Sequence, residues 1–309
     1  MSTYIIKRLL AALPVIAGVI AVVFILTTIV PGDPVRLMMG QRGDPATIER
    51  IKEDLGLNKP LWWQFLDFFR RALTLDLGKS YRNNMPVTRA IGQRIPLTAK
   101  IALSAMAIAV IMGVTLGIIS AVRQYSILDY GSMFVALLGI SAPTFWVGLL
   151  LVVLFCVKLG WIPGTGTGDG SWIYLVLPVI TLGIRPAALI ARLTRSSMLE
   201  IIRQDYIRTA WAKGLSERVV VMKHALKNAM IPVVTIIGIQ TATMLSGAIV
   251  TERVFSLPGI GRLSVEALIN RDFPVIRGEV LFLALIFVFT NLLVDLSYPL
   301  FDPRIKYDR

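Results

Sequence analysis

Few side chains in this sequence of 309 residues could perform catalysis or hold a metal. Cys156 is the single cysteine and His224 the single histidine, so neither an internal disulfide nor a metal site of several such residues can form. The glycine–lysine loop that cradles nucleotide phosphates does not occur in the sequence. Asp205, Lys213 and His224 lie in a charge-rich segment, where solvated side chains are expected. The sequence therefore predicts no catalytic residue, cofactor-binding residue or metal ligand.

Two charged residues, Arg185 and Asp295, lie inside otherwise apolar stretches. Charge at membrane depth is costly, so such residues are candidates for function. At 1.5 Å per residue both lie at similar depths, about 21 and 24 Å along their helices. They could form an ion pair. Alternatively, Arg185 could face a transport path and attract a substrate carboxylate, or extend toward lipid headgroups.

Two proline-containing sequences within the apolar stretches are candidate helix breaks, Ser141-Ala142-Pro143 and Arg185-Pro186. Either sequence can break its helix, which transporters tolerate where the backbone faces a cavity. A kink without any ligand role is the alternative interpretation. Ser141, Pro143, Arg185 and Asp295 are accordingly the candidate residues of a translocation path.

The composition indicates which elements must position these residues. Hydrophobic residues make up 55% of the chain and charged residues 17%, against about 45–50% and 25% in soluble domains. The 32 Lys and Arg against 19 Asp and Glu give a net charge of +13. The positive-inside rule explains this excess better than nucleic-acid binding does. Soluble enzymes, disordered chains and fibrous proteins are excluded, and a polytopic membrane protein is predicted.

A helix needs about 20 apolar residues to cross the hydrocarbon layer. Six stretches qualify, at residues 9–32, 101–122, 130–157, 171–191, 229–251 and 280–301. Lys7 and Arg8 could open a signal peptide, but the first stretch is too long and lacks a small-residue cleavage site. The prediction is an all-α transmembrane bundle of six spans, with 97–309 as its core.

The distribution of basic residues gives the orientation. With residues 1–8 in the cytoplasm, most basic residues of the short loops lie on the inner side, as the positive-inside rule requires. Both termini and the segment 192–228 are then cytoplasmic, and the loop 33–96 is extracytoplasmic.

The long outer loop is expected to be structured. Asp44-Pro45 can begin a helix that Gly56 ends, and the aromatic-rich residues 60–69 can lie at the headgroup level. The loop could be an interfacial helix pair packed on the bundle, a docking surface for an external partner, or both.

The cytoplasmic segment carries a helix–glycine–helix pattern. A short helix can end at Gly214 in the left-handed conformation, and Ser216 can cap a second helix. Val219, Met222 and Leu226 would share one face of that second helix. The segment could be two amphipathic helices on the inner leaflet, or a lever that transmits a partner's movement to the spans.

This segment resembles the EAA loop of the permease subunits of bacterial ABC importers, in the group that takes up dipeptides, oligopeptides, glutathione or nickel. Residues 206–215 read YIRTAWAKGL, which resembles the peptide-uptake branch. The general pattern is Glu-Ala-Ala, three residues, then Gly, so Arg208 replaces the glutamate here, and the usual Leu-Pro further on is absent. Further matches in order are PGDP at 31–34, LGLNKP at 55–60, SAPTF at 141–145, RLTRSSM at 192–198, ERVFSLPGIGR at 252–262, NLLVDL at 291–296 and DPRI at 302–305.

The resemblance covers essentially the whole chain and implies a type I ABC importer permease in the bacterial inner membrane. It also implies a second related permease, two ATPase subunits that bind ATP and Mg, and an extracytoplasmic solute-binding protein. The coupling helix of the EAA loop would dock in a groove of an ATPase. The residues it implies for this coupling are Asp205, Tyr206, Arg208, Thr209, Ala210, Ala212, Lys213, Gly214 and Leu215.

Di- or oligopeptides are the expected substrates, and glutathione or nickel is the alternative for the same machinery. The short loop at 158–170 points weakly to a glutathione-type permease. An ATP-independent secondary carrier is the alternative from another class, and it would transport without ATPase partners. A membrane enzyme would need clustered acid–base or metal-binding residues at one depth, which the sequence does not offer.

Overall fold

The computed structural model describes residues 2–29, 44, 49–50, 52–53, 56 and 58–301. Within these residues the regular structure is helical, apart from an isolated bridge between Lys79 and Pro86. The expected helix start at Asp44-Pro45 and the motifs at 31–34 and 302–305 lie wholly or partly outside the described residues. The principal elements are α1 (Ser2–Ile29), α4 (Leu61–Leu73), α5 (Val87–Gly92), α6 (Ile95–Val122), α7 (Ile127–Ser141), α8 (Thr144–Leu151), the π-helix η2 (Val152–Lys158), α9 (Ile173–Ile202), α10 (Asp205–Ala212), α11 (Glu217–Val219), the π-helix η4 (Val220–Ala225), α12 (Leu226–Leu245), α13 (Ile249–Val254), α14 (Ile260–Ile269) and α15 (Phe273–Phe301).

Among the described residues, five helical stretches are long and apolar enough to cross a membrane: Leu10–Thr28, Val87–Val122, Ile173–Ile202, Glu217–Leu245 and Phe273–Ser297. A sixth span is obtained if α7 is counted together with α8 and η2, although this pair is bent by 103°. The all-α transmembrane fold predicted from the apolar stretches is therefore confirmed.

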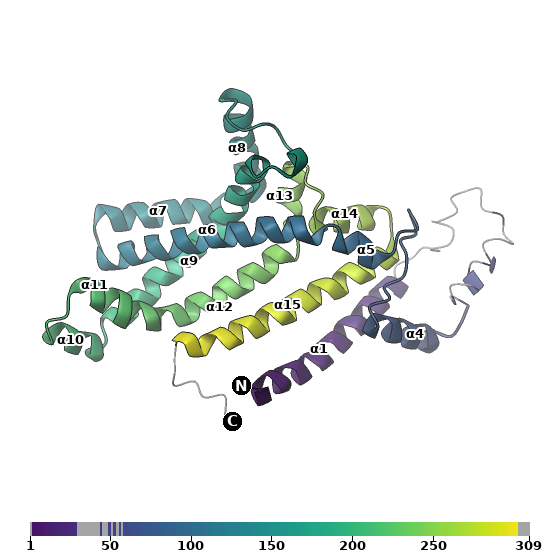
Figure 1. Cartoon of the computed structure of the whole chain (residues 1–309), viewed down its shortest axis with the longest axis horizontal. Helices are drawn as coiled ribbons and strands as arrows, with labels where there is room; N and C mark the ends of the chain where they lie inside the picture. Colours follow the sequence, from purple (N-terminus) through teal and green to yellow (C-terminus); the bar gives the residue numbers. More distant parts are fainter. Residues whose placement is uncertain are drawn as a thin grey trace.

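The long helices lie side by side (Figure 1). α9 packs against α6, α7 and α12, while α12 lies between α9 and α15, and α15 packs against α1. The short helices α10 and α11 lie at one end of the bundle, called here the α10 end. The helices α4, α5 and α14 lie at the other, called the α4 end.

Glycines on α6 allow its close contact with α9. A Cβ atom at Gly117 would lie 2.5 Å from the Thr194 Cβ, and one at Gly113 would lie 2.7 Å from the Ala187 carbonyl oxygen. Spaced four residues apart, the two glycines lie on one face of α6 and let the backbones approach, as small residues do in membrane bundles. The Gly113–Gly117 face therefore sets the distance between the two central helices.

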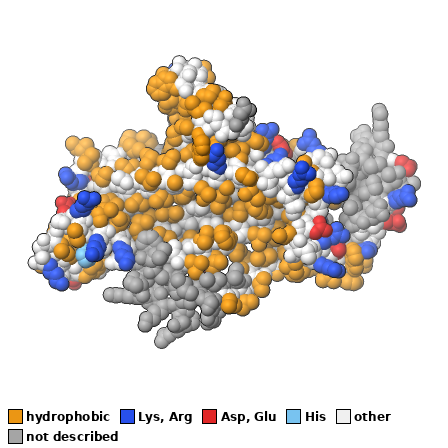
Figure 2. Space-filling model, in the orientation of Figure 1, with side chains coloured by type: hydrophobic (Ala, Val, Ile, Leu, Met, Phe, Trp, Pro, Cys, Tyr) orange, Lys and Arg blue, Asp and Glu red, His pale blue; other side chains and the backbone are white. Residues whose placement is uncertain are grey.

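The surface supports insertion in a bilayer. Figure 2 shows hydrophobic side chains over the long helices, with Lys and Arg gathered toward the two ends of the bundle. Leu26 and Ile111, for example, expose 59% and 68% of their surfaces. A contiguous apolar surface of this kind requires lipid or another protein to cover it.

Only one of the two proline sequences breaks its helix. α7 ends at Ser141, and Ala142 and Pro143 are extended with ψ of 129°, because a residue before proline is disfavoured in the helical region. The expected break at Arg185-Pro186 does not occur: α9 runs without interruption through Pro178 and Pro186, both buried. Packing against α6, α7 and α12 holds α9 together despite the missing N–H groups.

The second helix of the segment 192–228 begins after Ser216, as expected, although the Ser216 side chain makes no capping hydrogen bond. It is not a separate surface helix. α11, η4 and α12 form one continuous span, Glu217–Leu245. Of the residues expected to share one apolar face, Val219 and Met222 are exposed, whereas Val220 and Val221 between them are buried. These two buried residues begin the π-helix η4, whose wider turn departs from the α-helical spacing behind that expectation.

Candidate functional site

Helix α10 is anchored to the bundle by one face. Ile207 is fully buried and Ala210 is 6% exposed, and both pack with Met198 of α9 and with Val220 and Ala225 of η4. This apolar cluster joins α10 to the ends of the two spans that flank it. Helix α10 is therefore in direct packing contact with the ends of α9 and of the span that contains α12.

The opposite face of α10 is open to solvent. The residues expected to couple divide accordingly: Ala210 is buried, Leu215 is half-buried, and the exposed ones are Asp205, Tyr206, Arg208, Thr209, Ala212, Lys213 and Gly214. Arg208 and Asp205 form an exposed ion pair at 3.4 Å, and Trp211 exposes 45% of its surface beside them. This face presents charged and aromatic side chains together, as protein-binding surfaces commonly do.

The turn after α10 has the geometry that its glycine predicts. Gly214 has φ of +75°, in the left-handed region, and its N–H donates to the Trp211 carbonyl at 2.9 Å. Asn228 of α12 donates to the Tyr206 hydroxyl at 2.7 Å. The turn and this hydrogen bond fix the orientation of α10 against the start of α12.

A buried ion pair joins three helices near the α10 end. Asp129 at the start of α7 is 1% exposed and accepts two hydrogen bonds from Arg195 of α9, from Nε at 2.7 Å and from Nη2 at 2.8 Å. It also accepts from the Ser120 hydroxyl of α6 and from the Tyr125 N–H. We call this group the Asp129 clamp. It connects the ends of α6 and α7 to the helix that leads into α10.

Sequence reasoning did not find the Asp129 clamp. The local signal was Ser126, whose hydroxyl accepts from the Asp129 N–H and caps α7. A capping serine with an acidic residue three positions later marks a helix start, but it does not reveal a partner elsewhere in the chain.

The candidate path residues lie on three different elements. Ser141 and Pro143 are exposed at the break between α7 and α8, and Arg185 is exposed on α9. Gly139 of α7 packs close to Ile184, which places the break near the level of Arg185. Asp295 is half-buried on α15, on the other side of α12. No ion pair between Arg185 and Asp295 occurs among those joining described residues.

Buried carboxylates also hold the α4 end together. Glu252 is 2% exposed and accepts from the Thr98 hydroxyl at 3.0 Å and from the Arg262 N–H at 2.8 Å. Burial raises the pKa of Glu252, while these two donors oppose the rise. Asp272 accepts from the Tyr81 N–H at 3.0 Å and so fixes the segment before α5. In the part of the chain that the structure describes, no group of three His, Cys, Asp or Glu side chains could hold a metal ion.

Solved structures share this fold. An inward-facing structure of the MetNI methionine ABC transporter matches with a TM-score of 0.58 at 17% identity, covering 70% of this chain and 98% of that one. A second match, an amino acid ABC transporter crystallised with histidines, has a TM-score of 0.51. The helical bundle thus has the fold of type I ABC importer permeases.

Sequence comparison gives the family. Residues 113–307 match the binding-protein-dependent transport system inner membrane component, and residues 1–102 match the N-terminal region of such membrane components. The dipeptide transport permease DppB of Alkalihalophilus pseudofirmus is 45% identical, over 99% of this chain and 100% of the relative. The glutathione transport permease GsiC of Pectobacterium atrosepticum is also 45% identical, with the same coverage. The chain belongs to the family of binding-protein-dependent transport system inner membrane components. It is an inner-membrane permease of an ABC importer, as its motifs suggested.

Proposed function

We propose that this permease imports di- or oligopeptides and that α10 couples it to ATPase subunits. The proposed coupling rests on one observation, that α10 has two different faces. Ile207 and Ala210 are buried against the bundle, whereas Arg208 and Trp211 are exposed. A helix fixed on one side and exposed on the other can be pushed by a partner and move the spans with it. The names of the dipeptide and glutathione relatives support a peptide-like substrate.

The proposed complex contains this chain, a second related permease, two ATP-binding subunits and an extracytoplasmic solute-binding protein. ATP and Mg bind in the ATPase subunits, and this chain hydrolyses nothing. Helices α8 and η2 project from the bundle (Figure 1) with an apolar exposed surface that includes Trp146, 51% exposed, and Val157, 72% exposed. This surface suits contact with the second permease, because a large apolar patch is normally covered.

In the proposed mechanism, ATP binding closes the ATPase subunits and displaces α10. The apolar cluster around Ile207 passes the movement to α9 and α12, and the Asp129 clamp passes it from α9 to α6 and α7. The cavity shared by the two permeases then changes the side to which it opens. The binding protein delivers substrate at the α4 end, which we place outside the membrane with both termini in the cytoplasm.

Within this mechanism, Arg185 contributes a positive charge to the path. It is exposed on α9 at the level of the α7–α8 break, so a substrate in the path could reach it. A guanidinium group binds a carboxylate through charge-assisted hydrogen bonds, and every unmodified peptide ends in a carboxylate. Ser141 and Pro143 would line the same region, whereas Asp295 would lie away from it, behind α12.

ATPase activity of the reconstituted complex tests the substrate. We expect binding protein loaded with a dipeptide or an oligopeptide to stimulate hydrolysis above the level seen with unloaded binding protein. Stimulation by glutathione-loaded protein alone would replace the peptide assignment with glutathione. The same design with a nickel-loaded binding protein tests the remaining alternative.

A further inference from the structure

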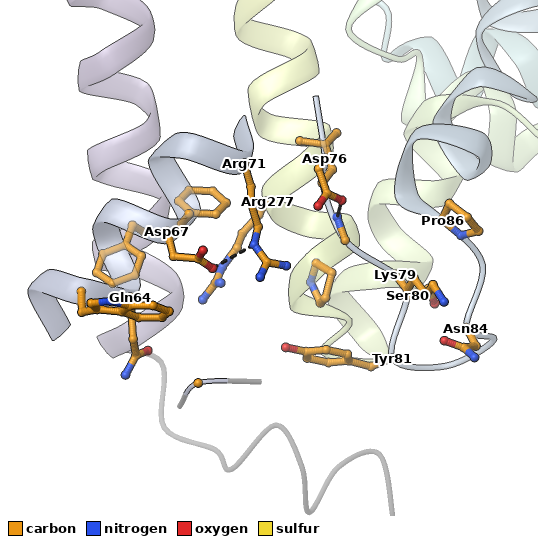
Figure 3. A pocket seen from close by; sticks show the side chains of 17 residues that line it. Gln64, Asp67, Arg71, Asp76, Lys79, Ser80, Tyr81, Asn84, Pro86 and Arg277 are labelled. Carbon is orange, nitrogen blue, oxygen red and sulfur yellow. Dashed lines mark hydrogen bonds and ion pairs between the residues drawn. The ribbon is translucent and has the colours of Figure 1, made fainter. Parts of the chain in front are cut away.

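A cavity of about 590 Å³ with both polar and apolar lining lies at the α4 end, between α1, α4, the segment before α5, and α15 (Figure 3). Its volume is within the range of about 300–1,000 Å³ that is usual for small-molecule sites. Its walls combine the aromatic rings of Phe24, Trp63 and Phe68 with the cationic side chains of Lys79 and Arg277. The mechanism described above makes no use of this cavity.

Arg277 forms no ion pair with a carboxylate among the described residues. Its Nε donates to the Thr27 hydroxyl oxygen at 2.7 Å, and its guanidinium lies over the Phe68 ring at 5.3 Å. Two carboxylates also line the cavity: Asp67 pairs with Arg71 at 2.8 Å, and Asp76 accepts from the Gly78 N–H at 3.2 Å, but neither forms an ion pair with Arg277 among the described residues. Figure 3 shows Arg277 among the side chains that line the cavity, beside the Asp67–Arg71 pair in this view. An anion is the ligand that would complete such a site.

An apolar groove of about 420 Å³ adjoins the cavity, between α1 and α15. It is lined by Val15, Gly18, Val19, Val22, Val23, Leu26, Thr27, Ile276 and Val280. Thr27 belongs to the groove and accepts the hydrogen bond from Arg277, so the groove and the cavity meet at this pair. From Val15 to Thr27 the groove follows α1 for about 18 Å, close to one leaflet of a ~30 Å hydrocarbon layer.

We propose that the Arg277 cavity and the α1–α15 groove together bind one phospholipid. The anionic phosphodiester would lie at Arg277 with Lys79 nearby, and an acyl chain would fill the groove. A free phosphate or a peptide carboxylate would satisfy Arg277, but neither would account for the adjoining apolar groove.

The outer surface of α4 supports this placement. Leu61, Trp62, Leu66 and Leu73 are exposed on it, at 58% to 67% of their surfaces. An amphipathic helix with exposed leucine and tryptophan lies at the membrane interface, which puts the adjoining cavity at the level of the headgroups. A phospholipid bound there would hold α1 and α4 against α15, and the inference does not depend on the transported substrate.

Native mass spectrometry of the complete complex, purified from membranes and supplied with phosphatidylglycerol, tests the proposal. Arg277→Gln removes the cation, and Arg70→Gln is its control, because Arg70 is exposed on α4 and does not line the cavity. Gly18→Leu fills the groove, since nothing lies within 4 Å of the Cβ position there. Gly131→Leu is its control, with an equally open position on α7 outside the groove.

We expect the unmodified complex and both controls to retain a phospholipid. Arg277→Gln should bind it at least about tenfold more weakly, as the loss of a charge-assisted hydrogen bond implies. Gly18→Leu should also reduce retention, and it tests the groove even if Arg277→Gln does not assemble. Retention equal to that of the unmodified complex in Gly18→Leu and Arg277→Gln would overturn the proposal. So would displacement of the lipid by millimolar inorganic phosphate with no effect of Gly18→Leu, since that result would indicate a site for free anions.

Discussion

Arg195 donates two hydrogen bonds from its guanidinium group to the carboxylate of Asp129, at 2.7 and 2.8 Å, although the two residues are 66 positions apart in the sequence. The aspartate is almost fully buried, whereas the arginine side chain keeps 25% of its surface exposed. The two partners are therefore unequal, and removing one should not have the same effect as removing the other. The pair joins α7 to α9, the helix that leads into α10, so in the proposed mechanism it would pass a displacement of α10 on to α7.

Arg195→Met should destabilise the permease more than Asp129→Asn. The first change leaves a buried carboxylate without its partner, which costs about 3–5 kcal/mol. The second leaves a partly exposed guanidinium and costs about 1.5–3 kcal/mol. Thermal unfolding of the purified complex would measure the order, with Arg192→Met as a control on an exposed position of α9. Equal losses for the two variants would show that the buried carboxylate does not dominate.

Gly214→Val should abolish substrate-stimulated ATPase activity while leaving the protein in the membrane. At φ of +75° a β-branched residue is strained by more than the roughly 1–2 kcal/mol of other side chains, although the Cβ position itself is open. Gly214→Asn should retain most of the stimulation, because asparagine tolerates this conformation. Unchanged stimulation in the valine variant would remove the proposed role of the turn.

Arg185→Ala should reduce uptake of peptides with a free carboxyl terminus and spare C-terminally amidated ones. The physical reason is the loss of the charge-assisted hydrogen bonds, worth about 1.5–3 kcal/mol, or at least about tenfold in affinity. Uptake into proteoliposomes with both peptides would show the difference, and Arg192→Ala serves as the matched control on α9. Affinity of the binding protein for each peptide must be measured separately. If both peptides are transported as before, Arg185 does not face the path.

Gly117→Ala should weaken the contact between α6 and α9. The added methyl group would lie 2.5 Å from the Thr194 Cβ, so the two helices must separate, at a cost of about 1–3 kcal/mol. Gly131→Ala has open space around its Cβ and should change the melting temperature little. Similar melting temperatures for the two alanine variants would contradict the close packing at Gly117.

Features set by local sequence were predictable. Long apolar runs indicated the spanning helices, the residue before Pro143 indicated the break in the third span, and Gly214 indicated the turn after α10. Each depends on the conformational preference of a few neighbouring residues. The same reasoning failed at Pro186, because packing against neighbouring helices overrides the local effect of proline there.

Features set by contacts between distant segments were not predictable. Nothing in the sequence around Asp129 points to Arg195, and nothing around Thr27 points to Arg277, which is 250 residues away. The π-helix η4 was also not predictable, because its wider turn departs from the α-helical spacing behind the expected common face of Val219, Met222 and Leu226. Such contacts can be identified only once the helices are packed together in the folded bundle.

Uptake of labelled peptide by proteoliposomes tests most directly whether this permease transports only when it is coupled through α10 to ATPases. The complete complex, with loaded binding protein outside and ATP inside the vesicles, should accumulate peptide. Vesicles without ATP, vesicles that hold the permeases without ATPases, and the Gly214→Val complex should not. Gradient-driven uptake by this chain alone would contradict the account and identify an ATP-independent carrier.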